Sequence, residues 1–256
     1  MQFPLRSLLA TAALTAAMLL PHAGSAEDKP LSKEEVKAIV KQVIRENPDL
    51  LFEVLADYEE KTKMARISRT AVNLSKMQDK LITDPQTPSI GNPKGSVTVV
   101  EFFDYHCGFC KRFFPEIVKL IQDDKDVRVV FKEFPILSVD SNLASKAALA
   151  VHSVAPDKYF DYHILLMNSK SEFTQPMLTD YAKQLGIDEA AFKKAFEDPV
   201  LGKQLDANKE LADSLDITAT PTIVVGTEVM PGAITYETLK QKVEAARDNQ
   251  KQRSGQ

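Results

Sequence analysis

The feature that most constrains this chain is its pair of cysteines, Cys107 and Cys110, since the sequence contains two cysteines in all. The apolar run Val97–Phe103 precedes the pair and predicts a buried strand, and the apolar spacing of residues 111–121 predicts a helix directly after it. Structural thiols have no reason to cluster at such a junction. The pattern therefore favours a redox site over two buried structural cysteines.

The position of Cys107 at the start of the predicted helix also indicates its chemistry. Unpaired N–H groups and the helix dipole favour a negative charge at a helix N-terminus. We therefore expect the pKa of Cys107 to lie below the value of about 8.5 that a free thiol has, so that a thiolate exists near neutral pH. Cys110 lies one turn into the helix, close enough to form a disulfide with Cys107.

Residues 1–26 have the pattern of a secretory signal peptide. Arg6 supplies a positive start, Leu8–Leu20 is apolar, and Gly24-Ser25-Ala26 offers small residues for cleavage after Ala26. The alternative is a membrane anchor, but the apolar run is too short to span a bilayer comfortably. The sequence therefore predicts export, with the periplasm as the expected location.

Export changes the meaning of the cysteine pair. Exported proteins usually use paired cysteines as structural disulfides, but a disulfide between Cys107 and Cys110 closes a loop too small to stabilise a fold. We therefore expect the chain to act on the disulfides of other proteins. In an oxidising compartment, oxidation or rearrangement of those disulfides is favoured.

Two helices are predicted before the cysteine domain, over residues 32–47 and 49–82. Ser32 and Glu35 fit a capping box at the start of the first helix. Both helices have apolar stripes that need a partner surface, and residues 59–70 between the stripes and the main domain are strongly polar. The stripes either dock on the same chain or mediate self-association. We favour self-association, as a dimer or a trimer.

A segment rich in Pro and Gly, residues 83–95, marks a domain boundary. The predicted organisation is a helical oligomerisation segment over 27–88 and an α/β domain over 89–256, with a helical insertion at about 138–216. The strands expected in the α/β domain cover residues 97–103, 127–132, 222–225 and 229–230, and a final helix covers 236–246 before a polar, frayed tail. The first strand, the cysteine helix and the second strand imply a right-handed parallel crossover.

The stretch Gly91–Arg247 resembles the DsbA-type thiol:disulfide oxidoreductases, which have a thioredoxin fold with an inserted helical domain. The resemblance is carried by Glu101–Cys110, by the helical insertion, and by Thr218–Thr222 before the next strand. The N-terminal helices resemble the extension of exported DsbA relatives that oligomerise through it, including ScsC-like proteins. The resemblance thus implies a thioredoxin fold preceded by a helical oligomerisation segment.

The resemblance also implies a role for each site residue. Cys107 would be the nucleophile that forms the mixed disulfide, and Cys110 would resolve it. Pro221 would be a cis-proline facing the disulfide, and Thr220 would contact the backbone of an extended client peptide. Glu101 matches a buried carboxylate that moves protons to or from Cys110; the alternative is a charge at the strand end that reaches solvent.

Three neighbouring residues modify this expectation. Phe109 stands where strongly oxidising DsbA proteins typically carry a histidine, so it cannot stabilise the thiolate by charge. His106 either compensates in part or is solvated. Thr220 before the proline resembles the isomerase DsbC more than DsbA. We therefore expect a weaker oxidant with oxidase and isomerase or reductase character mixed. Lys132 is a candidate ion-pair partner for Glu101.

Thiol–disulfide exchange needs no bound cofactor, and we expect neither a cofactor nor a metal. The expected partners are unfolded or wrongly disulfide-bonded exported proteins and a membrane redox protein that resets the dithiol. The net charge of -4 gives no reason to expect nucleic acid. Two alternatives are a copper or zinc protein that uses Cys107, Cys110 and His106, and a non-catalytic holdase. A CxxC motif supplies two zinc ligands, and no second pair follows at zinc spacing.

Overall fold

The computed structural model describes residues 30–255 of the chain, which divide within a helix into two compact units, one up to Tyr58 and one from Glu59 onward. The predicted signal peptide and its cleavage site after Ala26 lie outside the described residues. Within residues 30–255, no helix combines the length and the apolar character that crossing a bilayer requires.

The N-terminal unit contains helix α1 (Lys33–Glu46) and the first part of α2 (Pro48–Gln78). The capping box is present: Ser32 accepts a hydrogen bond from the Glu35 N–H, and the Glu35 carboxylate accepts one from the Ser32 N–H at 2.8 Å. No described residue of α1 is buried. The unit therefore exposes a set of large apolar side chains: Val36, Ile39, Val40, Val43, Ile44, Leu50, Leu51, Phe52, Val54, Leu55 and Tyr58.

The second unit is built on a mixed sheet. Among the described residues the sheet has five strands in the order β1-β3-β2-β4-β5, with β2 and β3 parallel and the other neighbours antiparallel. The strands are β1 (Ser89–Gly91), β2 (Val97–Phe103), β3 (Val127–Glu133), β4 (Thr222–Val225) and β5 (Glu228–Pro231). Four of them were predicted, and the thioredoxin-type α/β fold is confirmed. Strand β1 lies in the segment that the sequence marked as helix-breaking, so its three residues were missed.

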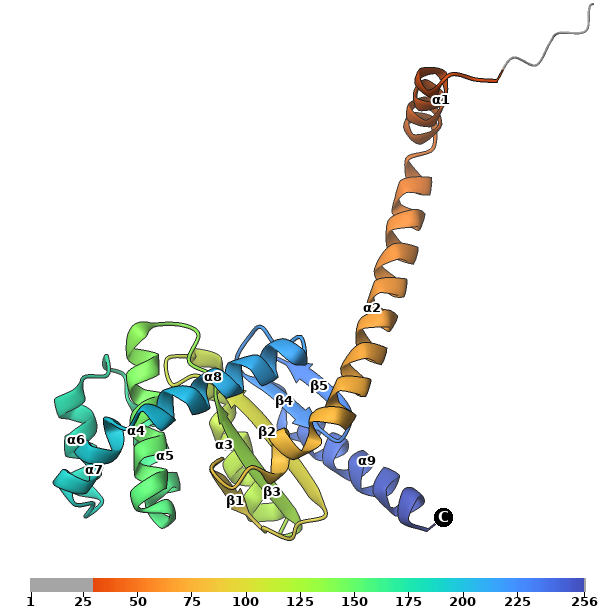
Figure 1. Cartoon of the computed structure of the whole chain (residues 1–256). Helices are drawn as coiled ribbons and strands as arrows, with labels where there is room; N and C mark the ends of the chain where they lie inside the picture. The colour runs from red at the N-terminus through yellow and green to blue at the C-terminus, as the bar shows by residue number, and fades with distance from the viewer. Residues whose placement is uncertain (1–29, 256) are drawn as a thin grey trace, which may run out of the picture. The chain divides into compact units, whose positions relative to one another are not determined.

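The remaining helices flank this sheet and form the insertion between β3 and β4 (Figure 1). They are α3 (Gly108–Asp123), α4 (Val139–Val154), α5 (Tyr159–Asn168), α6 (Gln175–Gln184), α7 (Glu189–Phe196), α8 (Pro199–Ser214) and α9 (Tyr236–Ser254), with a 3₁₀ turn η2 (Pro156–Lys158) before α5. The insertion contains α4 to α8, as predicted, and α4 to α7 gather beside the sheet in Figure 1.

Alternate residues of β2 point to opposite faces of the sheet and enter two separate cores. Val99 and Phe103 face the larger core, which includes residues of α3, α9 and the insertion. Val100 and Phe102 face the smaller core, which includes Leu211 and Leu215 at the end of α8. Leu74 of α2 and Leu81 of the π-helical turn η1 (Asp79–Thr83) complete the smaller core.

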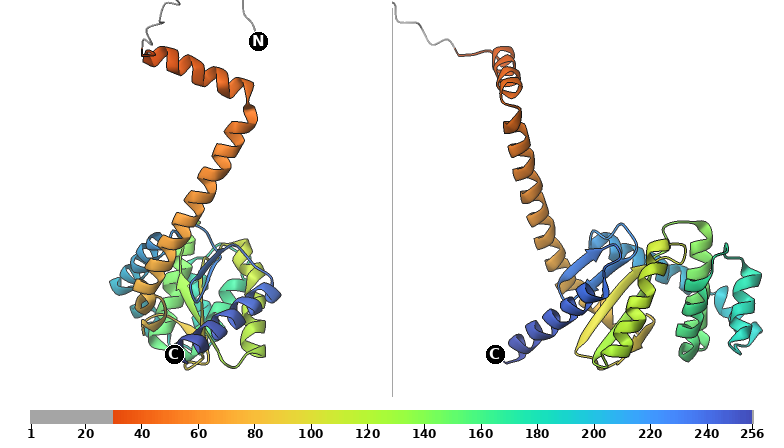
Figure 2. Two further views of the ribbon diagram at one scale, coloured as in Figure 1. Left: turned by 90° about the vertical axis from the view of Figure 1, so that its right-hand side faces the viewer. Right: turned by 180° about the vertical axis from the view of Figure 1, so that it is seen from behind.

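Helix α9 is longer than predicted, and the expectation of a frayed tail after residue 246 was wrong. The helix continues to Ser254, and Figure 2 (right) shows it extending past the sheet. Arg247 explains part of the extension, because its guanidinium pairs with Asp124 at 2.7 Å and with Asp126 at 3.5 Å. These ion pairs fasten the second half of α9 to the turn after α3.

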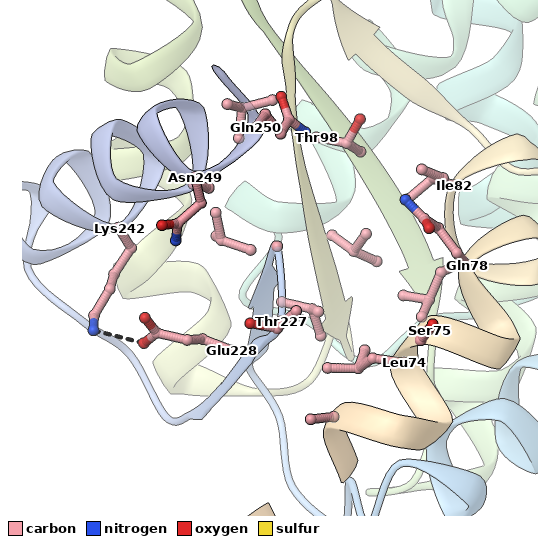
Figure 3. Close-up of a pocket in the computed structure, with 18 of the residues that line it drawn as sticks. Leu74, Ser75, Gln78, Ile82, Thr98, Thr227, Glu228, Lys242, Asn249 and Gln250 are labelled. Carbon is pink, nitrogen blue, oxygen red and sulfur yellow. Dashed lines mark ion pairs between the residues drawn. The ribbon is translucent and has the colours of Figure 1, made fainter. Parts of the chain in front are cut away.

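A groove of about 870 Å³ lies between the end of α2, the start of β2, the β4–β5 turn and α9 (Figure 3). Its floor is apolar, with Leu74 among the lining residues, and the Lys242–Glu228 ion pair at 2.6 Å lies on one side. Val97 and Thr98 at the start of β2 line the groove, whereas the cysteines follow the end of that strand. The groove is therefore remote from the cysteine pair.

Candidate active site

The cysteine pair lies where β2 passes into α3. Cys107 is the N-cap residue of α3, and its N–H donates to the Asp104 carbonyl at 3.0 Å. The Cys107 sulfur accepts a hydrogen bond from the Cys110 N–H at 3.2 Å and donates one to the Thr220 carbonyl at 3.1 Å. Both cysteines are free thiols in the described chain. The structure thus shows the reduced site.

The two thiols differ strongly in acidity. A hydrogen bond from the Cys110 thiol, followed by contributions from Thr220 and from the Cys110 and Phe109 N–H groups, lowers the pKa of Cys107 to about 6 against the effect of burial. Burial raises the pKa of Cys110 far above that of a free thiol, and the hydrogen bond to Cys107 and the charge of Glu101 act in the same direction. Near neutral pH the site therefore holds a thiolate at Cys107 and a protonated thiol at Cys110.

Glu101 is a buried carboxyl group beneath the cysteines. Its side chain is 0% exposed, and neither carboxylate oxygen has a hydrogen-bond partner among the described residues. Burial first, and the charge of Cys107 second, raise the pKa of Glu101 to about 8. The alternative of a strand-end charge that reaches solvent is wrong. A group with this pKa can exchange a proton near neutral pH.

Thr220 and Pro221 come from the loop before β4 and lie beside Cys107. The peptide bond between them is cis, as the resemblance implied. The Thr220 carbonyl accepts the hydrogen bond from the Cys107 thiol, although the two residues are 113 positions apart in the sequence. The structure therefore brings Cys107, Cys110, Thr220 and Pro221 together and places Glu101 below them.

Lys132 is not the ion-pair partner of Glu101, and the sequence-based expectation was wrong. In the register of β2 and β3, Glu101 lies beside Phe131 on one face of the sheet. Lys132 is the next residue of β3, so its side chain points to the opposite face. There its ammonium donates to the Lys80 carbonyl at 2.7 Å and to the Thr87 hydroxyl at 2.8 Å. Burial lowers the pKa of Lys132 to about 8. Its position fastens η1 and the following segment to the sheet.

His106 does not extend freely into solvent. Its Nε2 atom contacts the Asp140 Oδ2 atom in the first turn of α4, and its ring lies 4.9 Å from that of Phe173. The His106 side chain is therefore held against the insertion by Asp140 and Phe173.

Asp104 is a buried neighbour of the cysteine pair that the sequence reasoning missed. Its buried carboxylate accepts hydrogen bonds from the His106 N–H at 2.7 Å, from the Ile136 and Leu137 N–H groups at 2.9 and 3.0 Å, and from the Ser141 hydroxyl at 2.7 Å. A carboxylate at the end of a buried strand is the signal that could have identified it. Asp104 links the cysteine loop to the start of the insertion.

A second buried polar cluster was also missed. Tyr105 and Tyr159 each donate a hydrogen bond to the Glu133 Oε1 atom at 3.1 Å, and the Tyr105 hydroxyl lies 2.8 Å from the His163 Nδ1 atom. Burial raises the pKa of Glu133 to about 8 and lowers that of His163 to about 3. The cluster joins the ends of β2 and β3 to α5, so it connects the sheet with the insertion.

The outer side of the motif is apolar. Phe109 is 59% exposed, and the Arg112 guanidinium lies 4.2 Å from the centre of its ring. Within the part of the chain that the structure describes, no group of three or more His, Cys, Asp or Glu side chains is placed to hold a metal ion. The arrangement can carry out thiol chemistry on a partner that approaches Cys107 past Phe109.

Comparisons with known proteins agree with this geometry. The sequence model of a family described as Thioredoxin matches residues 83–245. Disulfide bond formation protein D of Bacillus subtilis is 31% identical over 167 residues, which cover 61% of this chain and 75% of that protein.

Two solved structures are similar over most of their length. A linker-deletion mutant of Proteus mirabilis ScsC is 29% identical with a TM-score of 0.66 and covers 87% of this chain and 99% of that chain. The thiol-disulfide exchange protein alpha-DsbA2 of Wolbachia pipientis is 33% identical with a TM-score of 0.66, and the match covers 71% of this chain and 97% of that chain.

Proposed function

The chain belongs to the DsbA-type thiol:disulfide oxidoreductases of the thioredoxin family, and from this membership we propose that it is an exported enzyme that forms or rearranges disulfides in client proteins. Cys107 is the nucleophile and Cys110 the resolving thiol. The observation that carries the proposal is the difference in acidity between the two thiols, with the pKa of Cys107 lowered to about 6 and that of Cys110 raised by burial.

In the oxidising direction the enzyme begins with a Cys107–Cys110 disulfide. A client thiolate attacks the Cys107 sulfur and displaces Cys110, which takes up a proton. A second client thiolate then attacks the client sulfur of the mixed disulfide, and Cys107 leaves as a thiolate. Two electrons pass from the client to the enzyme, and a membrane redox partner carrying a disulfide removes them again.

In the isomerising direction the same groups act from the reduced state. The Cys107 thiolate attacks a wrong client disulfide and forms a mixed disulfide, which a different client thiol resolves, so no net electrons are transferred. Glu101 exchanges a proton with Cys110 when Cys110 must itself act. Thr220 and Pro221 face the mixed disulfide and hold the client backbone.

We expect oxidase and isomerase or reductase activity to be mixed. The thiolate is stabilised by Cys110, Thr220 and N–H groups, and Phe109 contributes no charge to it. A less stabilised thiolate makes a weaker oxidant, because the reduced form is then less favoured. A redox titration that gave a potential as high as that of the strongest DsbA oxidants would contradict this point.

Export and self-association complete the proposal. The pattern of residues 1–26 supports export to the periplasm. The apolar side chains that α1 and the first turns of α2 expose support self-association through this unit, since such a set is costly to leave in water. Several active sites on one oligomer would suit rearrangement of a single misfolded client.

The test compares the wild type with Cys107→Ser in two assays, reduction of insulin and reactivation of scrambled ribonuclease. We expect wild type to be active in both assays and the variant in neither, because serine cannot form the mixed disulfide. Cys110→Ala should instead accumulate mixed disulfides with clients. If wild type and Cys107→Ser behave alike, the proposal is wrong and a holdase function gains support.

A further inference from the structure

His106, directly before Cys107, is fixed on three sides. Its N–H donates to the Asp104 carboxylate at 2.7 Å, its Nε2 atom contacts Asp140, and its ring packs edge-on against Phe173 at 4.9 Å. The side chain of His106 is 26% exposed. A histidine next to the nucleophile is therefore turned toward the insertion and held there.

Asp140 is itself well fixed as an anion. It lies in the first turn of α4, and its Oδ2 atom accepts the Phe173 N–H at 3.1 Å in addition to contacting His106. A hydrogen bond from Ser138, followed by those from Phe173 and His106, lowers the pKa of Asp140 to about 2. Asp140 is therefore charged throughout the working pH range and opposes any charge that His106 carries.

Lys111 follows the same arrangement, whereas the Arg112 guanidinium lies against the Phe109 ring on the outer side of the motif. The Lys111 ammonium, one residue after Cys110, contacts the Ser169 carbonyl and lies 5.8 Å from the centre of the Phe173 ring. The Asp104 carboxylate is buried in hydrogen bonds to the insertion. The insertion thus contacts both basic side chains that flank the cysteines in sequence.

We propose that Asp140 is a positioning residue that holds His106 away from Cys107 and cancels its charge, so that the inserted helical domain limits the oxidising strength of the site. A positive charge beside Cys107 stabilises the thiolate and thereby favours the reduced enzyme, which makes the disulfide a stronger oxidant. Asp140 keeps the His106 imidazole from acting as such a charge on Cys107. The inference rests on the proposed function only in requiring that the Cys107–Cys110 pair undergoes thiol–disulfide exchange.

The experiment is a double-mutant cycle on the full chain with D140N, H106Q and the double variant. Two quantities are measured: the pKa of Cys107 from the ultraviolet absorbance of its thiolate, and the equilibrium constant for exchange with glutathione. D140E serves as the conservative variant. D188N is the matched control, because Asp188 is an exposed carboxylate that caps α7 through the Ala191 N–H.

We expect D140N to lower the pKa of Cys107 by about half a unit and to shift the glutathione equilibrium about threefold toward the reduced enzyme, which corresponds to about 15 mV. In the H106Q background the same substitution should have less than half of this effect. D140E and D188N should leave both quantities near those of the wild type. This dependence on His106 is what a merely structural role of Asp140 does not produce.

The inference is overturned if D140N leaves the pKa of Cys107 unchanged, or shifts it equally with and without His106. If D140N does not fold, nuclear magnetic resonance of the His106 imidazole in the wild type provides the test. We expect a single tautomer whose Nε2 proton is protected from exchange with water. Rapid exchange of that proton overturns the inference. A wild type that does not exchange with glutathione contradicts the proposed function instead, which keeps the two failures distinct.

Discussion

At the scale of single residues, Cys107 and Cys110 share one hydrogen-bonded arrangement yet differ in acidity because their surroundings differ. The Cys107 sulfur receives hydrogen bonds at a helix N-terminus, whereas Cys110 is fully buried above the carboxyl group of Glu101. The start of the same helix thus carries a thiolate at Cys107 and a protonated thiol at Cys110. This difference leads to two predictions for individual side chains.

The first prediction concerns the source of the Cys107 acidity. Cys110→Ala removes the thiol that contributes most to lowering the pKa of Cys107, while the Cys110 and Phe109 N–H groups remain. We expect the pKa of Cys107 to rise from about 6 by about one unit, as followed by thiolate absorbance or by the pH dependence of alkylation. An unchanged pKa in Cys110→Ala would show that the backbone alone stabilises the thiolate.

The second prediction concerns Glu101 and pH. The pKa of Glu101 is raised to about 8 from an ordinary 4.5, so the folded state keeps a proton that the unfolded state releases. Its contribution to stability is therefore complete below about pH 4.5 and is lost as the pH rises to about 8. Glu101→Gln does not undergo this loss of stability, and we expect it to be more stable than the reduced wild type by about 4 kcal/mol at pH 8, with little difference at pH 4.

Urea denaturation at both pH values measures the effect of Glu101→Gln. Glu237→Gln is the matched control, because Glu237 is an exposed carboxylate in the first turn of α9. If the free energy of unfolding differs by the same amount between Glu101→Gln and wild type at both pH values, Glu101 does not hold the proton.

The chemical role of a residue could be predicted from the sequence where the residues that determine it lie within one short stretch. The cysteine pair follows from its spacing at the strand-to-helix junction, whereas the buried carboxyl group of Glu101 was implied by the resemblance to the DsbA-type family. The partner of Lys132 was not predictable in the same way, because its face of the sheet depends on register with β2. His106 and Asp140 are 34 positions apart, so their contact follows from the packing of the insertion and from no pattern in either segment.

At the scale of elements, Asp104 is one of the residues that attach the cysteine loop to the insertion. One buried carboxylate accepts hydrogen bonds from the loop itself, from the segment after β3 and from the first turn of α4. The third prediction is that Asp104→Ala lowers the free energy of unfolding by about 3 kcal/mol, because it leaves buried N–H groups without acceptors.

Chemical denaturation of Asp104→Ala and of a capping control separates this effect from the loss of an ordinary cap. Asp198→Ala removes the exposed carboxylate that caps α8 through the Val200 N–H, and such a cap contributes about 1 kcal/mol. We expect the loss of stability to be clearly larger for Asp104→Ala. Equal losses of unfolding free energy in Asp104→Ala and Asp198→Ala would mean that the cysteine loop, the segment after β3 and α4 stay packed without the Asp104 carboxylate.

Helices and strands were largely predictable because apolar periodicity follows burial in this chain. The core strands β2 and β4 have the predicted bounds, and the insertion contains the predicted helices. Strand β1 was missed because it is defined by pairing with β3 and not by its own side chains. The full length of α9 was missed because ion pairs of Arg247 with distant aspartates support it.

At the scale of the whole molecule, the fourth prediction concerns self-association. Val40 and Leu51 are exposed apolar residues of the N-terminal unit, and replacing both by glutamate places charges in any interface formed there. We expect size-exclusion chromatography with light scattering to show an oligomer for wild type and a monomer for V40E/L51E. Insulin reduction per site should be retained, because Cys107 and Cys110 are untouched.

Gln42→Glu is the matched control, since it adds one charge to α1 at a residue that is already polar and exposed. A monomeric wild type, or a double variant that stays oligomeric, would contradict self-association through this unit. Substitution is a better test than a chain that begins at Ser89, because such a chain would lack Leu74 and Leu81, which are buried in the smaller core.

The hydrogen bonds around Cys107 have one more consequence, for the enzyme before it has folded. The sulfur is held between the start of α3 and the Thr220 carbonyl, which lies 113 residues further along the chain. In an unfolded chain the hydrogen bonds that lower the pKa of Cys107 are absent, and the pKa returns to the value of about 8.5 that a free thiol has. At pH 7 about 3% of such thiols are ionised, compared with about 90% at a pKa near 6. The thiolate therefore becomes the predominant form of Cys107 only after distant parts of the chain have come together around its sulfur atom.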